Sequence, residues 1–292
     1  MKRRGRIWGA ASVIAVCLFC LAGVAAGQGA SASRGTTTSS KSSTTLGRDN
    51  SPLNPENSLE LIKPADKSEQ AAFDKFQAVS PEDPKKKIQL GEALLQKYPA
   101  SRYRASVYSD LTGAYLQTNQ VPKMLDAGEK ALALNPKNVQ VLAMLGQTIP
   151  RVITASTPDP DAEISKAEQY SKRAIETMPT IPKPEDMSDA QFVQAKDQTL
   201  AIAHSGLGLV DFHRGDFAGA IAELQQSVKL DPRADPVNYY VLGVANVNAS
   251  HFDDAVTAFK KCAEFPGSLQ QTCKDNLDKA KALGAAQPAA PK

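Results

Sequence analysis

Histidine and cysteine, the residues that most often carry metal binding and redox chemistry, are scarce in this 292-residue chain. It has three histidines, His204, His213 and His251. No two of them have the i, i+4 spacing that places a pair of metal ligands on one helix face. Of the four cysteines, Cys17 and Cys20 lie within the N-terminal apolar stretch, and the other two, Cys262 and Cys273, are too far apart to form a Cys-x-x-Cys pair, which argues against a redox-active dithiol in the rest of the chain. Glycine-rich phosphate loops and nucleophile elbows are also missing. The sequence therefore predicts no cofactor, no metal site and no catalytic residues.

Aromatic residues and unbalanced charge are also in short supply. Aromatic residues make up 6% of the chain although 42% of it is hydrophobic, a composition that suits thin helical layers better than a thick core. Four of the 34 basic residues lie within the first six positions, which leaves 30 basic residues against 31 acidic ones in the rest of the chain. The overall balance therefore gives no reason to expect binding to nucleic acid.

The N-terminus looks like a targeting segment. A basic run precedes the apolar stretch 7–26, and small residues follow, as in a secretory signal peptide over residues 1–26 with cleavage after Ala26 or Ala32. The alternative is an uncleaved anchor, because residues 7–27 are about long enough to span a bilayer. Both interpretations predict export of the remaining chain, to the periplasm or the cell exterior. The Ser/Thr-rich residues 27–66 and the tail 285–292 are predicted to be disordered.

Small and aromatic residues recur at a fixed spacing between residues 67 and 284. The clearest copy lies in residues 201–232, and a glycine at its centre returns 35 residues later. A fifth and weakest copy spans residues 68–99. The recurring positions are Tyr108, Leu111, Tyr115 and Pro136; Leu145, Gly146, Ala167 and Pro179; Leu207, Gly208, Gly215, Phe217, Ala220, Leu224 and Pro232; and Leu242, Gly243, Phe252, Ala255 and Phe259. This pattern resembles the tetratricopeptide repeat (TPR).

The resemblance implies an all-α fold, a right-handed solenoid of four to five antiparallel helix hairpins. A helix over residues 268–283 is expected to cap the last hairpin. Ser80 is predicted to cap the second helix of the first hairpin, with Pro81 next to it. Pro150 is expected to kink or end its helix. Ser188 is predicted to start a long helix through a capping box, and Gly215 to end the first helix of the clearest hairpin.

Members of this family commonly bind an extended peptide or a partner helix in a concave groove. The resemblance implies a groove that is polar but almost uncharged, so hydrogen bonds and apolar contacts are expected instead of a carboxylate clamp. The alternative is a structural component of an envelope assembly, tethered by its N-terminal segment and without a groove function. Membrane contact is expected only through that segment. The groove positions are Ser109, Gln117, Gln140, Gln147, Ser205, His213, Tyr240 and Asn248.

The two cysteines that follow the targeting segment lie on either side of a predicted turn. Cys262 and Cys273 flank residues 265–268, so they are expected to face each other across a helix pair. In an oxidising compartment this placement predicts a disulfide, and the alternative is a pair of buried thiols. His204 is predicted to be a core histidine, and Asp216 to cap a helix start.

Overall fold

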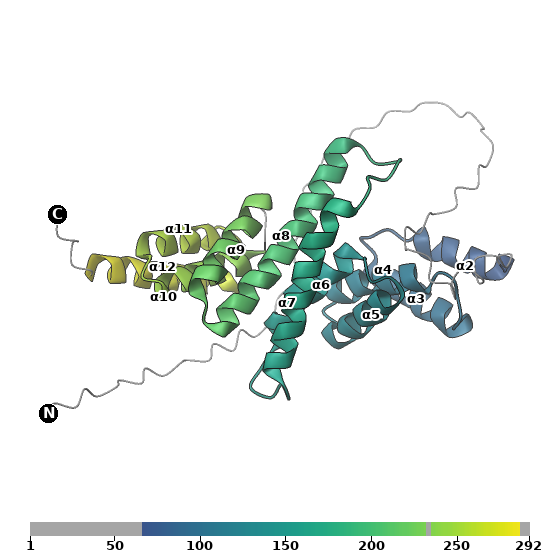
Figure 1. Cartoon of the computed structure of the whole chain (residues 1–292), viewed down its shortest axis with the longest axis horizontal. Coiled ribbons are helices and arrows are strands. Elements are labelled where there is room, and N and C mark those ends of the chain that lie inside the picture. Colours follow the sequence, from purple (N-terminus) through teal and green to yellow (C-terminus); the bar gives the residue numbers. More distant parts are fainter. Residues whose placement is uncertain (1–65, 232–234, 287–292) are drawn as a thin grey trace. The chain divides into compact units, whose positions relative to one another are not determined.

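A computed structural model describes residues 66–231 and 235–286. These residues form α-helices α2 to α12 and one short 3-10 helix, with no strand among them (Figure 1). The predicted all-α fold of antiparallel helix hairpins is confirmed. The predicted targeting segment and nearly all of the linker lie outside the described residues, as do Pro232 and most of the predicted tail. Within the described ranges, no helix is both long enough and apolar enough to cross a membrane.

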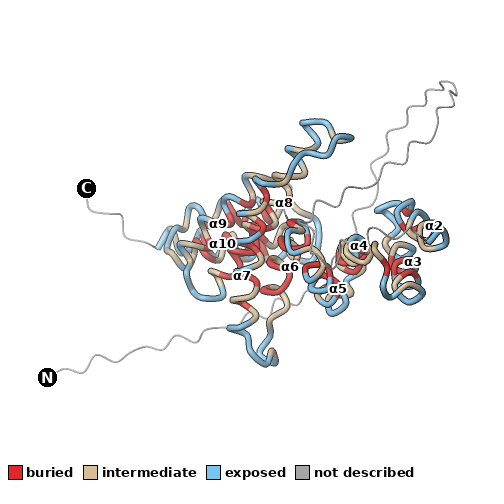
Figure 2. Tube along the Cα trace, turned by 45° about the vertical axis from the view of Figure 1, so that its right-hand side comes forward, coloured by how far each residue is buried: buried red, intermediate tan, exposed pale blue. Residues whose placement is uncertain are grey.

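The chain divides into two compact units, with the boundary between Val141 and Leu142. The described part of the first unit contains α2 (Lys67–Gln77), α3 (Pro84–Lys97), α4 (Arg104–Gln117) and α5 (Val121–Leu134). α2 packs on α3, and α4 packs on both α3 and α5. The fully buried side chains include Phe76, Leu111 and Met124, which form a thin apolar layer between the helices. Buried segments along the inner sides of the helices are visible in Figure 2.

The start of α3 differs from the predicted one. Asp83 caps this helix through a hydrogen bond from the Lys86 backbone N–H, and Pro84 occupies the first turn. The prediction that Ser80 caps the helix, with Pro81 in its first turn, is therefore wrong. Both sites place a capping side chain directly before a proline, so the local signal fits either of them.

The helix α6 (Val139–Val152) crosses the boundary between the two units, and the second unit contains it from Leu142 onward. The second unit also contains α7 (Pro160–Thr177), a 3-10 turn (Met178–Thr180) and α8 (Asp189–Arg214). It continues with α9 (Phe217–Leu230), α10 (Pro236–Asn248), α11 (Phe252–Ala263) and α12 (Leu269–Ala286). Successive helices pack against each other from α7 to α12: α7 on α8, α8 on α9, α9 on α10, α10 on α11 and α11 on α12. The final helix covers α11, as a capping helix should.

α8 is the longest of these helices, with 26 residues. Ser188 and Gln191 form the predicted capping box, and Gly215 ends the helix in a left-handed conformation with φ of 77°. Both predictions are confirmed. Pro150 lies inside α6, which ends two residues later at Val152. Pro150 removes one backbone donor and its ring crowds the carbonyl of Gly146, which accounts for the end of α6 within the next turn.

Candidate functional site

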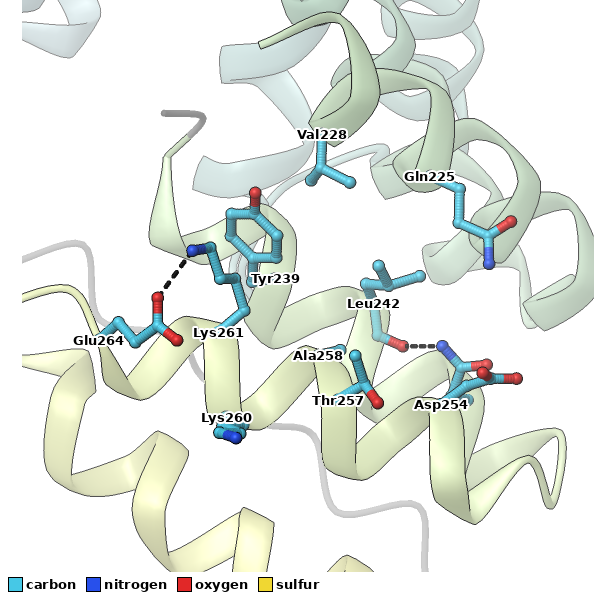
Figure 3. Close-up of a pocket in the computed structure, with 11 residues that line it drawn as sticks. Gln225, Val228, Tyr239, Leu242, Asp254, Thr257, Ala258, Lys260, Lys261 and Glu264 are labelled. Carbon is cyan, nitrogen blue, oxygen red and sulfur yellow. Dashed lines mark hydrogen bonds and ion pairs between the residues drawn. The ribbon is translucent and has the colours of Figure 1, made fainter. Parts of the chain in front are cut away.

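A cavity of about 440 Å³ lies between α9 and α11, with side chains of α10 between them (Figure 3). We call this surface the α9–α11 groove. It belongs entirely to the second unit. Its lining residues are Gln225 and Val228 from α9, Tyr239, Leu242 and Asn246 from α10, and Asp254, Thr257, Ala258, Lys260, Lys261 and Glu264 from α11.

Helical periodicity accounts for this lining. On α10 the contributing positions are 239, 242 and 246, and on α11 they include 254, 257, 258 and 261. Spacings of three, four and seven residues place side chains on one face of a helix. These positions form one stripe on each helix, and Lys260 extends the α11 lining beyond its stripe, because it lies about 100° around the helix from Lys261.

The floor of the groove is apolar. Tyr239, Leu242 and Ala258 are buried there, and the Tyr239 ring stacks on Phe265 with a centroid distance of 5.7 Å. Burial raises the pKa of Tyr239 further above its ordinary value of 10.0, at which the phenol is already neutral at physiological pH. A floor of this kind offers contact area to an apolar side chain.

The two ends of the groove differ in charge. At the C-terminal end of α11, the Lys261 ammonium pairs with the Glu264 carboxylate at 2.7 Å, and this hydrogen bond raises the pKa of Lys261. At the other end Asp254 is exposed and forms no ion pair within the described part of the chain. The groove therefore has a basic end, where the Lys261 charge is already paired with Glu264, and an acidic end.

Asn246 lies near the C-terminal end of α10, just before the turn into α11, and is only 1% exposed. Its Nδ2 donates to the Leu242 carbonyl oxygen at 2.8 Å. Its Oδ1 has no hydrogen-bond partner among the described residues. Buried side-chain acceptors are nearly always paired in folded proteins, so this oxygen is an unused hydrogen-bond acceptor within a residue that lines the groove.

The structure places two of the predicted groove residues in the interior. Ser205 is fully buried, and its hydroxyl donates to Asn238 Oδ1 at 2.7 Å. Tyr240 is buried beside the Phe259 ring. The prediction that these two side chains face a partner does not fit this structure, because packing within the second unit already covers both.

The other predicted groove residues of the second unit are partly engaged within the chain. Gln147 donates to Ser205 Oγ at 2.9 Å, and His213 Nε2 lies 2.8 Å from the Pro150 carbonyl oxygen. Asn248 is exposed but donates to the Val244 carbonyl of its own helix. In the first unit, Ser109 accepts a hydrogen bond from Asn138, whereas Gln117 and Gln140 are exposed.

No protein-family model and no curated protein matches this sequence, but solved structures resemble it. A TPR protein from Thermus thermophilus is 17% identical, with coverage of 73% of this chain and 99% of its own and a TM-score of 0.47. PilW, a type IV pilus biogenesis factor, is 17% identical, with coverage of 76% and 90% and a TM-score of 0.49. A TPR protein from Parabacteroides merdae is 12% identical, with coverage of 74% and 100% and a TM-score of 0.35.

Two successive hairpins of the second unit repeat the same close approach of helices. A Cβ atom on Gly208 would lie 2.6 Å from Leu224 Cγ, and one on Gly243 would lie 2.6 Å from Phe259. In both hairpins a glycine of the first helix thus admits a large side chain sixteen residues later. This is a TPR-like fold. Its small residues stand where the backbones of paired helices come closest.

A buried polar network ties together the TPR-like hairpins of the second unit. Asn238 accepts hydrogen bonds from Ser205 and from Arg151 (3.3 Å), and it donates to Ser227 at 3.1 Å. Arg151 also pairs with Asp235, the N-cap residue of α10. Burial alone would raise the pKa of Asp235, but the Arg151 charge and two hydrogen bonds lower it below its usual value. Sequence reasoning missed Arg151, Asn238 and Asp235, because no local pattern links them.

A second charged cluster lies on the hairpin formed by α8 and α9. Burial, together with the carboxylates of Asp216 and Glu223, raises the pKa of Asp211 to about 6. His204 Nδ1 lies 2.7 Å from Glu223 Oε2, and Asp216 caps α9 as predicted. In the described residues, no group of three or more histidine, cysteine or acidic side chains could hold a metal ion.

Cys262 and Cys273 lie opposite each other between α11 and α12 of the TPR-like fold. Both are fully buried, and their Cα atoms are 5.8 Å apart, a separation that suits a disulfide. Formation of the bond in the cell stays a prediction, tested below.

Proposed function

We propose that this TPR-like chain is a non-enzymatic interaction protein that binds a segment of a partner protein in the α9–α11 groove. The observation that carries the proposal is the cavity of about 440 Å³ with an apolar floor and polar side chains at both ends. Binding sites combine such an apolar centre with a polar rim, and this volume is within the usual range of about 300–1,000 Å³.

Three packed helices hold the groove open. α9, α10 and α11 each bury their other faces in the second unit, so the groove does not need to be assembled from loose segments. Binding of a partner segment therefore costs this chain little conformational entropy. The concave surface proposed from the sequence gains less support here, since Ser205 and Tyr240 are buried.

We also propose that the chain acts in the cell envelope. This rests on residues 1–26 and on the pair of cysteines that can form a disulfide outside the cytoplasm. Membrane contact through residues 7–27 and the absence of nucleic-acid binding are part of the same proposal. Determining the N-terminal residue of the mature protein tests it, because cleavage after Ala26 or Ala32 requires export.

Two neighbouring glutamines provide a test of groove binding. Gln225 lines the groove, whereas Gln226 is exposed on the same helix and does not line it. A photo-crosslinking amino acid can be placed at either position. The two positions differ mainly in the direction they face, by the rotation of about 100° between consecutive helical residues. In intact cells, we expect position 225 to crosslink one defined envelope protein and position 226 to crosslink none.

The captured partner then gives a binding measurement. Gln225→Trp should fill part of the groove and weaken binding of the purified partner, and Gln226→Trp should leave binding unchanged. Equal crosslinking from both positions would contradict a groove function. A partner that crosslinks only elsewhere on the chain would favour the alternative of a structural component of an envelope assembly.

A further inference from the structure

The acidic end of the α9–α11 groove holds an unpaired acceptor and a carboxylate without an ion pair. Asn246 Oδ1 is unpaired in the described structure, and its own Nδ2 is occupied by the Leu242 carbonyl. Asp254 lines the same groove, and its carboxylate forms no ion pair within the described residues. Asp254 lies in the first turn of α11, so only the partial positive charge of the helix N-terminus compensates its carboxylate. A cationic donor can pair with this carboxylate and with the desolvated Asn246 acceptor.

Exposed side chains border the end of the groove at which Asp254 lies. Gln225, Asp254 and Thr257 border this end of the groove, and all three are exposed. Exposed side chains change rotamer on the nanosecond timescale, so an incoming donor can displace them. The buried floor residue Leu242 does not need to move.

The opposite end has the reverse charge. Lys260 is exposed, lines the groove and has no ion pair within the described residues, while the neighbouring Lys261 is held by Glu264. Asp254 and Lys260 are six residues apart on α11, so their positions differ by about 9 Å along the helix axis. An extended chain covers that length in about three residues.

Resting on the proposed function, we propose that the bound segment is an extended peptide with a lysine or arginine at the acidic end and an aspartate or glutamate about three residues away. The basic side chain donates to Asp254 and Asn246, and the acidic side chain pairs with Lys260. An apolar residue between them packs on the floor formed by Tyr239 and Leu242. Charge complementarity thus fixes the orientation of the peptide in the groove.

Two adjacent aspartates allow a matched test. Asp254 lines the groove, whereas Asp253 is exposed in the same helical turn and does not line it. The full chain and its Asp254→Asn and Asp253→Asn variants are each used to select binders from a display library of random ten-residue peptides. The full chain and Asp253→Asn should enrich peptides with a basic and an acidic residue three apart. Asp254→Asn should lose the preference for the basic residue.

One enriched peptide then serves as the probe in a direct binding titration. Asp254→Asn should weaken its binding about tenfold, the effect of losing a charge-assisted hydrogen bond, and Asp253→Asn should change it little. Charge reversal by Asp254→Lys should shift the selected peptides toward an acidic residue at that end. Each of these results would support the proposal.

Two other outcomes separate the inference from the function on which it rests. Peptides whose binding is blocked by Gln225→Trp, but which show no charge preference sensitive to Asp254, would overturn the charge-based inference and leave groove binding in place. Enrichment of no peptide, or binding that Gln225→Trp does not affect, would overturn both.

Discussion

Arg151 and Asp235 form an ion pair although 84 residues separate them in the sequence. The Arg151 side chain is only 9% exposed, and its guanidinium also donates to Asn238. The pair connects the end of α6 with the start of α10. It therefore fixes how two non-adjacent helices of the second unit are arranged, a role that the repeat pattern itself does not reveal.

Replacing Arg151 by methionine should destabilise the protein by about 2 kcal/mol, because it leaves the Asp235 carboxylate, whose side chain is 26% exposed, without its partner. Urea denaturation followed by circular dichroism at pH 7 measures this loss. Lys130→Met is the control, since Lys130 forms an exposed i, i+4 pair with Asp126 that contributes about 0.3–0.5 kcal/mol. Equal losses in the two variants would show that the Arg151–Asp235 pair contributes no more to stability than an exposed ion pair.

Asp211 should make the folded protein less stable as the pH rises. Burial and neighbouring carboxylates raise its pKa to about 6, so the folded state binds its proton more tightly than the unfolded state. The stability from the protonated form is complete below the ordinary value of 3.8 and is lost as the pH rises through about 6. Asp211→Asn removes this dependence. Because Asp211 is partly exposed, solvent screening reduces the expected gain to about 1 kcal/mol at pH 8.

Urea unfolding of the wild type and Asp211→Asn at pH 4 and at pH 8 tests the sign of this effect. The variant should be more stable than the wild type at pH 8, and the gain should shrink at pH 4. Asp278→Asn provides the control, because Asp278 is an exposed residue of α12. A gain of the same size at both pH values would exclude ionisation of Asp211 as its cause.

Local signals in the sequence predicted where helices begin and end, whereas contacts between different helices could not be predicted from it. The capping box at Ser188 and the left-handed Gly215 each depend on a few consecutive residues, and the structure contains both. The burial of Ser205 depends on Gln147 and Asn238, which approach it from other helices. A hairpin register indicates which face of a helix a residue occupies, but not what packs on that face.

The candidate groove was missed for the same reason. Its residues come from three helices, and periodicity marks the stripe on each helix without showing that the stripes border a cavity. The unpaired Asn246 Oδ1 could not be predicted either. An asparagine inside a helix is usually interpreted as a weak helix former, and only the surrounding packing decides whether its oxygen finds a donor.

The cysteine pair should form a disulfide when the chain is exported. Closing this short loop should stabilise the protein by roughly 2–3 kcal/mol in the loop-entropy model. Thiol labelling of the denatured protein without reductant should find Cys262 and Cys273 blocked, and reductant should lower the unfolding midpoint. Labelling of both cysteines in protein purified from the cell exterior would instead support two buried thiols, and reductant should then leave the midpoint unchanged.

Gly208 and Gly113 should respond in opposite ways to the same substitution. A Cβ on Gly208 would lie 2.6 Å from Leu224 Cγ and 3.2 Å from the Leu224 backbone nitrogen, whereas a Cβ on Gly113 would meet nothing within 4 Å. Gly208→Ala must therefore push α8 and α9 apart, which should cost about 1–3 kcal/mol. Gly113→Ala fills open space inside α4 and should stabilise the helix by about 0.5–1 kcal/mol.

Thermal and urea unfolding of both variants measures this difference in sign. Because the two substitutions add the same methyl group to a helical glycine, helix propensity favours both equally. Any loss specific to Gly208→Ala then reports the close approach of the two helices. If Gly208→Ala were as stable as Gly113→Ala, the α8–α9 hairpin would have to be wider than the structure places it. The glycine of the repeat signature would then owe its position to something other than helix contact.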